Sequence, residues 1–125
     1  MARIIIAEDE KDIRELIAFT LRYVGHDVLA YSNGEDAWNN TLVEMPDLII
    51  LDIRMPIMTG YEVCKKIKAN PLTERIPVMF LTSKGQEEEI KTGFDHGALD
   101  YLLKPFAPEE LNKKVQTILS RNQTT

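Results

Sequence analysis

Short hydrophobic runs alternate along the chain with longer segments in which apolar residues recur every three or four positions. The run at 48–51 is entirely aliphatic and carries no charge, which is typical of a strand covered on both faces in a parallel sheet. The runs predict five strands, at residues 3–7, 27–31, 48–52, 77–81 and 100–103.

The segments between the runs have the period and the end signals of helices. Ile13, Ile17 and Leu21 share one face of a first helix, which Gly25 ends. Ser32, followed three residues later by Glu35, predicts a capping box at the start of a second helix. Thr59 and Glu62 have the same spacing and predict the start of a third.

Two further helices are expected in the second half of the chain. Ile90 and Phe94 lie one turn apart in a fourth helix that ends near Gly97. Pro108 suits the first turn of a fifth helix, because its missing N–H would have no partner there. We expect this helix to fray after Ser120.

Strand and helix alternate about five times with short connections. This order predicts right-handed βαβ units and a doubly wound parallel sheet with helices on both faces. No linker, repeat or low-complexity tract interrupts it, so we expect residues 1–125 to form a single α/β domain.

Composition limits the classes of protein to which this chain can belong, but it says little about the function. With 125 residues, 44% of them hydrophobic and 28% charged, the chain can bury a core of its own. Its net charge of −5 argues against direct nucleic-acid binding. No apolar stretch is long enough to span a membrane, and the lone Cys64 cannot form an internal disulfide. These features predict a soluble cytoplasmic protein without membrane attachment.

Polar residues follow four of the five predicted strands. Since the carboxyl ends of parallel strands meet at one edge of the sheet, these side chains are expected to converge there. The set contains three carboxylates, two hydroxyls and two lysines: Glu8, Asp9, Asp52, Thr82, Ser83, Lys84 and Lys104.

This combination of groups suits phosphoryl chemistry. Three neighbouring carboxylates repel one another unless a cation neutralises them, and oxygen ligands without His or Cys favour Mg²⁺. Asp52 can act as a nucleophile that forms an aspartyl-phosphate. Lys104 and the hydroxyl of Thr82 can contact the equatorial oxygens of a transferring phosphoryl group.

On these residues the sequence resembles the receiver domain of two-component response regulators, from residue 3 to about residue 120. The resemblance implies a flavodoxin-like (βα)5 fold with strand order 2-1-3-4-5, and a cis peptide bond before Pro105. The matching residues are Glu8-Asp9, Asp52 within LDIRMPIMTG, Thr82-Ser83, and Lys104-Pro105 with Tyr101 nearby.

The resemblance also implies roles for the site residues. Asp52 would accept a phosphoryl group from the phosphohistidine of a sensor histidine kinase or phosphotransfer protein. Asp9 would bind Mg²⁺ directly and Glu8 through water, together with Asp52 and the backbone carbonyl of Arg54. Lys104 would pair with the phosphoryl oxygens.

A switch and a phosphate lifetime are implied in the same way. Thr82 and Tyr101 would change the surface of the fourth helix, fifth strand and fifth helix, which an output protein or effector domain would bind. Arg54, Ser83 and Lys84 would tune access of the hydrolytic water, in a direction that the residue types leave open. The chain would act as a monomer or as a phosphorylation-dependent dimer.

Three other classes of protein compete with this interpretation. A small Mg²⁺-dependent phosphatase of the haloacid-dehalogenase type also uses a strand-end aspartate, but it needs a second Asp where this chain has Arg54. An FMN-binding module would need a Gly-rich loop in place of Glu8-Asp9. An inert docking domain would not need the full set. We therefore expect a signalling domain that catalyses only its own phosphorylation and dephosphorylation, and not an enzyme acting on a separate substrate.

Overall fold

The computed structural model describes residues 2–83 and 87–123 of the chain, and five strands alternate there with five helices. The strands are β1 (Arg3–Ala7), β2 (Asp27–Tyr31), β3 (Leu48–Asp52), β4 (Val78–Ser83) and β5 (Asp100–Lys104). The helices are α1 (Lys11–Tyr23), α2 (Gly34–Glu44), α3 (Gly60–Ala69), α4 (Glu87–Asp95) and α5 (Pro108–Gln123).

The strands form one parallel sheet in the order β2-β1-β3-β4-β5. This is the order that the family resemblance implied, and it places β1 and β3 side by side in the sheet. In the central register Ile4 lies opposite Leu48 and Ala7 lies opposite Leu51. The residues that follow β1 and β3 therefore emerge next to each other.

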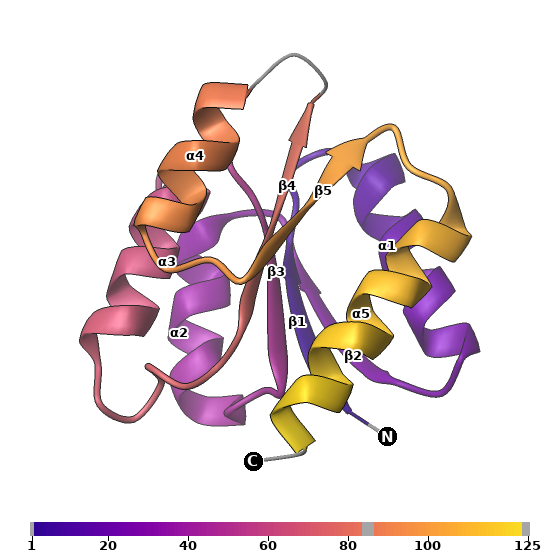
Figure 1. Ribbon diagram of the computed structural model, residues 1–125, viewed down its shortest axis with the longest axis horizontal. Helices are drawn as coiled ribbons and strands as arrows, with labels where there is room; N and C mark the ends of the chain where they lie inside the picture. The colour runs from indigo at the N-terminus through magenta and orange to yellow at the C-terminus, as the bar shows by residue number, and fades with distance from the viewer. Residues whose placement is uncertain (1, 84–86, 124–125) are drawn as a thin grey trace.

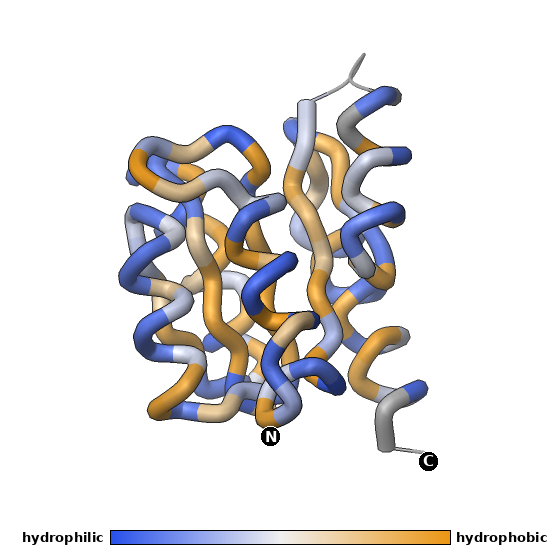
Figure 2. Tube along the Cα trace, turned by 90° about the vertical axis from the view of Figure 1, so that its left-hand side faces the viewer, coloured by the Kyte–Doolittle hydropathy of each residue, from blue (hydrophilic) through white to orange (hydrophobic). Residues whose placement is uncertain are grey.

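Helices cover both faces of the sheet. Helices α1 and α5 lie on one face, and α2, α3 and α4 lie on the other (Figure 1). The core accordingly has two halves, one that includes Ile17 and Val115 and another that includes Val63 and Ile67. Figure 2 shows the hydrophobic colour concentrated along the strands between these layers. Both chain ends lie at the edge of the sheet opposite the arrowheads of β4 and β5 (Figure 1).

The helix starts agree with sequence prediction in one case and differ by a residue in another. Thr59 and Glu62 form the expected capping box, because the Thr59 hydroxyl accepts from the Glu62 N–H and the Glu62 carboxylate accepts from the Thr59 N–H. At α2 the cap is Asn33, whose side chain accepts from the Asp36 N–H at 2.8 Å, so the prediction of Ser32 was wrong. Asn is as good a cap as Ser, and here it carries the bond.

Three element ends also differ from prediction. Strand β4 runs over Val78–Ser83, where 77–81 was expected, because Thr82 and Ser83 still pair with Leu103 and Lys104 of β5. The same pairing extends β5 to Lys104. Helix α5 continues to Gln123, past the fraying expected after Ser120. In each case hydrogen bonding continues through polar residues that a hydrophobic pattern does not include.

The start of α3 is pressed against the end of β3. The Gly60 N–H donates to the carbonyl of Ile53 at 2.9 Å, and a Cβ on Gly60 would lie 2.4 Å from the carbonyl oxygen of Asp52. Only glycine permits this close backbone approach. It closes the loop of residues 53–59 on itself beside Asp52.

None of the helices in the described ranges combines the length and the apolar character needed to cross a bilayer.

Candidate functional site

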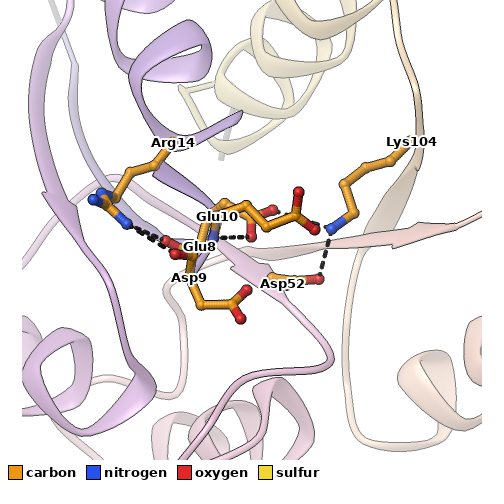
Figure 3. Close-up of polar contacts among 6 residues, drawn as sticks. All are labelled: Glu8, Asp9, Glu10, Arg14, Asp52 and Lys104. Atoms are coloured by element: carbon orange, nitrogen blue, oxygen red, sulfur yellow. Dashed lines mark hydrogen bonds and ion pairs between the residues drawn. The ribbon is translucent and has the colours of Figure 1, made fainter. Parts of the chain in front are cut away.

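Three carboxylates meet at the carboxyl edge of the sheet, as the strand pattern predicted. Glu8 follows β1 and has no exposed surface, and Asp52 ends β3 with 4% of its surface exposed. Asp9 is exposed to solvent. One carboxylate oxygen from each of the three lies within 4.8 Å of the others (Figure 3).

Lys104 connects the two buried carboxylates. Its Nζ lies 3.1 Å from Oε1 of Glu8 and 3.2 Å from Oδ1 of Asp52 (Figure 3). The peptide bond between Lys104 and Pro105 is cis, as the family resemblance implied. The other oxygen of the Glu8 carboxylate, Oε2, accepts from the Glu10 N–H at 3.0 Å. The ammonium group at the end of β5 therefore lies directly beside the carboxylate at the end of β3.

Burial dominates the electrostatics of these groups. It raises the pKa of Glu8 to about 7, and the neighbouring charge of Asp52 adds to this effect. Burial also raises the pKa of Asp52, although Lys104 counteracts part of the increase. Burial alone would lower the pKa of Lys104, but the charges of Asp52 and Glu8 outweigh it and raise that pKa. One lysine thus compensates only part of the cost of burying two carboxylates.

The donor set can hold a metal ion. All three nearby ligand atoms are carboxylate oxygens, and hard divalent cations prefer oxygen ligands. A divalent ion would also supply the positive charge that a single lysine does not. The cluster of Glu8, Asp9 and Asp52 therefore fits a metal in both geometry and charge.

Arg14 of α1 holds the backbone of Glu8 and Asp9 and was not singled out from the sequence. Its Nη1 donates to the carbonyls of Glu8 at 2.9 Å and of Asp9 at 3.3 Å (Figure 3). Its position in the sequence was a clue, because a positive charge in the first turn of a helix interacts unfavourably with the helix dipole. Another interaction must therefore favour arginine at this position. That interaction is visible only in the structure, where the carbonyls of Glu8 and Asp9 lie within reach of the guanidinium.

Three other predicted site residues lie at or just after the carboxyl ends of β3 and β4. Thr82 is buried near the end of β4, with 2% of its surface exposed. Ser83 follows it and is exposed, as is Arg54 in the loop after β3. Lys84 lies outside the described residues.

Tyr101 lies on β5, half-buried and between two neighbours. Its ring meets Phe94 of α4 edge to face, with the centroids 5.9 Å apart. The Nζ of Lys114 lies 5.0 Å from the centre of the ring, and it also pairs with Asp100 at 3.0 Å. The side chain of Tyr101 therefore contacts both α4 and α5, the two helices that flank β5.

The sheet order and the acid–lysine edge define a flavodoxin-like α/β protein with a site at the carboxyl ends of its strands. The family model for the response regulator receiver domain matches residues 4–116. The chain therefore belongs to the response regulator receiver domain family. This match does not favour the phosphatase alternative, and it characterises the chain as a signalling domain of two-component systems.

Relatives of known sequence and structure agree with this family. The chain is 39% identical over 121 residues to the alkaline phosphatase synthesis transcriptional regulatory protein of Bacillus subtilis, covering 97% of this chain and 50% of that protein. It is 39% identical to the phosphate regulon transcriptional regulatory protein of Pseudomonas aeruginosa, covering 94% and 52%. The chain thus spans about half the length of these curated relatives.

Solved structures show the same fold. The chemotaxis response regulator of Vibrio cholerae superposes with a TM-score of 0.89 at 32% identity, over 94% of this chain and 98% of that one. The signal receiver domain of a histidine kinase from Syntrophus aciditrophicus gives a TM-score of 0.91 at 31% identity, over 100% and 95%.

Proposed function

We propose that Asp52 of this chain accepts a phosphoryl group from the phosphohistidine of a sensor histidine kinase or phosphotransfer protein. The observation that carries the proposal is the contact of Lys104 with Asp52 at 3.2 Å, inside a cluster of three carboxylates. A carboxylate at the mouth of a buried strand, with a cation beside it, is placed to attack phosphorus. On this proposal residues 1–125 act as one receiver domain.

The proposed transfer exchanges one bond to phosphorus for another. An oxygen of Asp52 forms the new O–P bond while the P–N bond to the donor histidine breaks, and its electron pair returns to the imidazole. Lys104 would contact the phosphoryl oxygens, as its ammonium lies within 3.2 Å of both carboxylates. The hydroxyl of Thr82 would donate to another of these oxygens.

The metal in this proposal is Mg²⁺. Asp9, Asp52 and the backbone carbonyl of Arg54 would hold it directly, and Glu8 would hold it through water. When bound, it supplies positive charge to the phosphoryl oxygens. The chain's own contribution is the fixed position of the ligands, since Arg14 restrains the backbone of Glu8 and Asp9.

Intact-mass measurement tests the acceptor. The protein is incubated with acetyl phosphate and Mg²⁺, and we expect the mass of one added phosphoryl group in the wild type and none in Asp52→Asn. Asp95→Asn, which changes an exposed carboxylate of α4, serves as the control and should be labelled normally. Equal labelling of Asp52→Asn would remove Asp52 from this role.

We further propose that phosphorylation is transmitted through Thr82 and Tyr101. The hydroxyl of Thr82 would move toward the phosphoryl group and leave space for the ring of Tyr101, whose contacts with Phe94 and Lys114 reach α4 and α5. Thr82→Ala should then keep its labelling by acetyl phosphate but lose much of the response of an output partner. A full response in this variant would contradict the switch.

The phosphate lifetime would be tuned by Arg54, Ser83 and Lys84, which stand at or just after the ends of β3 and β4 in the sequence. Arg54 and Ser83 are both exposed, so each can reach water that approaches Asp52. The decay of the labelled protein, compared between the wild type and Arg54→Ala, measures this contribution directly.

The proposed function also requires an output partner. The curated relatives are about twice as long as this chain and are named transcriptional regulatory proteins. We infer that the receiver domain controls an output protein or effector domain through the α4-β5-α5 surface, as a monomer or as a phosphorylation-dependent dimer. With a net charge of −5, the chain is not expected to bind nucleic acid itself. A cytoplasmic location follows from an ATP-dependent kinase as phosphodonor.

A further inference from the structure

Ile57 adopts a backbone conformation that isoleucine rarely takes. It lies in the loop of residues 53–59 between β3 and α3, and its φ is +71°. The Met58 N–H donates to the carbonyl of Pro56 at 2.7 Å, which closes a three-residue γ-turn around Ile57. A γ-turn with positive φ is uncommon and strained, and for a β-branched residue the left-handed region is a true outlier.

The side chain of Ile57 gains little from packing in return. It is 75% exposed, so its apolar surface faces solvent. Glycine or asparagine would fit this backbone without the steric cost and without exposing hydrocarbon. The residue is therefore unfavourable twice over in the isolated chain.

The rest of the loop holds the turn in place. Met58 is partly buried against the half of the core that includes Val63. At the far end of the loop the Gly60 N–H donates to the carbonyl of Ile53 at 2.9 Å. Strained conformations persist only where their surroundings determine them, and they concentrate at functional sites. The loop therefore presents Ile57 in a fixed position.

That position is beside the acceptor. Ile57 is three residues from Gly60, a span of roughly 11 Å at most, and a Cβ on Gly60 would lie 2.4 Å from the carbonyl oxygen of Asp52. The Cα of Ile57 therefore lies within roughly 15 Å of Asp52. A protein that brings a histidine onto Asp52 covers about 800 Å² of this surface, a patch of roughly 16 Å radius. A protein donor docked over Asp52 thus extends to the tip of the loop, whereas a small phosphodonor does not.

We propose that Ile57 is a specificity-determining residue for the protein phosphodonor, inserting its side chain into an apolar recess next to the donor histidine. The inference rests on the proposed function of Asp52 and identifies how the partner is recognised. Because the turn is already formed, little conformational entropy is lost on docking. Burial of one isoleucine side chain corresponds to roughly a 10- to 100-fold gain in affinity.

The variant Ile57→Asn tests recognition of the protein phosphodonor separately from phosphoryl transfer to Asp52. Asparagine tolerates positive φ but lacks the apolar side chain, so we expect the midpoint of thermal unfolding to rise by roughly 2–6 °C. Labelling by acetyl phosphate should stay unchanged. The protein phosphodonor is an autophosphorylated histidine-kinase core, chosen from a panel of purified cores because it labels the wild type. With this donor, kcat/KM for transfer to Ile57→Asn should be at least tenfold lower than for the wild type, mainly because KM rises.

Two control variants sharpen the result. Val43 of α2 is also β-branched and 75% exposed but lies in regular helix, so Val43→Asn should lack the thermal gain and keep normal transfer. Ile57→Val keeps an apolar β-branched side chain and should transfer like the wild type.

The outcomes distinguish this inference from the proposed function. Normal kinase transfer in Ile57→Asn, with normal acetyl phosphate labelling, would overturn the role of Ile57 and leave Asp52 as the acceptor. If acetyl phosphate did not label the wild type, that result would instead contradict the proposed function. If Ile57→Asn abolished self-association of the phosphorylated chain and left transfer intact, Ile57 would bind a second copy of this chain and not the phosphodonor. The inference would then be wrong.

Discussion

Two buried carboxylates, Glu8 and Asp52, share the ammonium group of Lys104. Each loses hydration on burial, and the pKa of each is raised as a result. In this state a proton or a divalent cation relieves the same excess of negative charge. The site is therefore more stable when it has bound either one.

The stability of the metal-free protein should fall as the pH rises through neutrality. The pKa of Glu8 is about 7 in the folded chain and near 4.5 when unfolded, so between these values only the folded state keeps the proton. Raising the pH across this window then costs up to about 3 kcal/mol of unfolding free energy. Urea unfolding with a chelator at pH 5 and at pH 7.5 measures the difference.

Glu8→Gln provides the control for this pH dependence. The amide cannot titrate, so the difference in unfolding free energy between the two pH values should shrink markedly. An equal loss of stability in Glu8→Gln would assign the dependence to another group.

Arg14 and Arg22 form a matched pair for testing how α1 supports the site. Each guanidinium donates to backbone carbonyls, Arg14 to Glu8 and Asp9, and Arg22 to Val28 at 2.8 Å. Alanine at either position should cost about 1 kcal/mol of stability. Only Arg14→Ala should slow labelling by acetyl phosphate at saturating Mg²⁺, because only there do the proposed metal ligands lose the hydrogen bonds that fix their backbone. Equal rates in the two variants would contradict this positioning role.

At the scale of elements, the hydrophobic pattern found the strands and the turn chemistry found most helix ends. Strands β1, β2 and β3 match the predicted bounds, because their apolar runs end sharply at polar residues. The ends of β4 and β5 were missed, since Thr82, Ser83 and Lys104 are polar and still lie in the ladder. These are also residues of the predicted site, so the polar residues proposed for function lie within the strand pairing there.

The contact between α3 and β3 should be intolerant of any side chain. In Gly60→Ala the new Cβ would meet backbone atoms of Asp52 and Ile53, which cannot rotate away. We expect a loss of about 1–3 kcal/mol in chemical denaturation, and slower labelling of Asp52 because its strand end is displaced.

Gly93→Ala is the corresponding control in α4. Its Cβ would lie 2.6 Å from the ring of Phe80, and its three nearest neighbours are all atoms of that ring and none of Asp52, so stability should fall while acetyl phosphate labelling continues. Normal labelling of Gly60→Ala would show that the approach of α3 does not position Asp52.

For the whole molecule, the strand–helix pattern predicted the fold class and the convergence of the acidic residues, whereas the strand order was implied by the family resemblance. The pattern could do so because parallel strands bring their carboxyl ends together whatever the details of packing. It missed contacts that depend on how the chain folds back in three dimensions. The bonds of Arg14 and the turn at Ile57 belong to this group, as neither follows from spacing along the chain.

Magnesium should stabilise the whole fold through the site. A ligand that binds only the folded state adds about 2.7 kcal/mol when its concentration is 100 times its Kd. We expect MgCl₂ to raise the thermal midpoint of the wild type well above the effect of NaCl at equal ionic strength. In Asp9→Asn, which lacks one carboxylate of the cluster, this increment should be much smaller. An equal increment would place the ion elsewhere.

Both chain ends emerge at the edge of the sheet remote from Asp52 (Figure 1). A fluorescent protein or an affinity tag joined to either end would therefore leave the approach of a kinase unobstructed. Designers of phosphorylation-driven biosensors can use both attachment points at once.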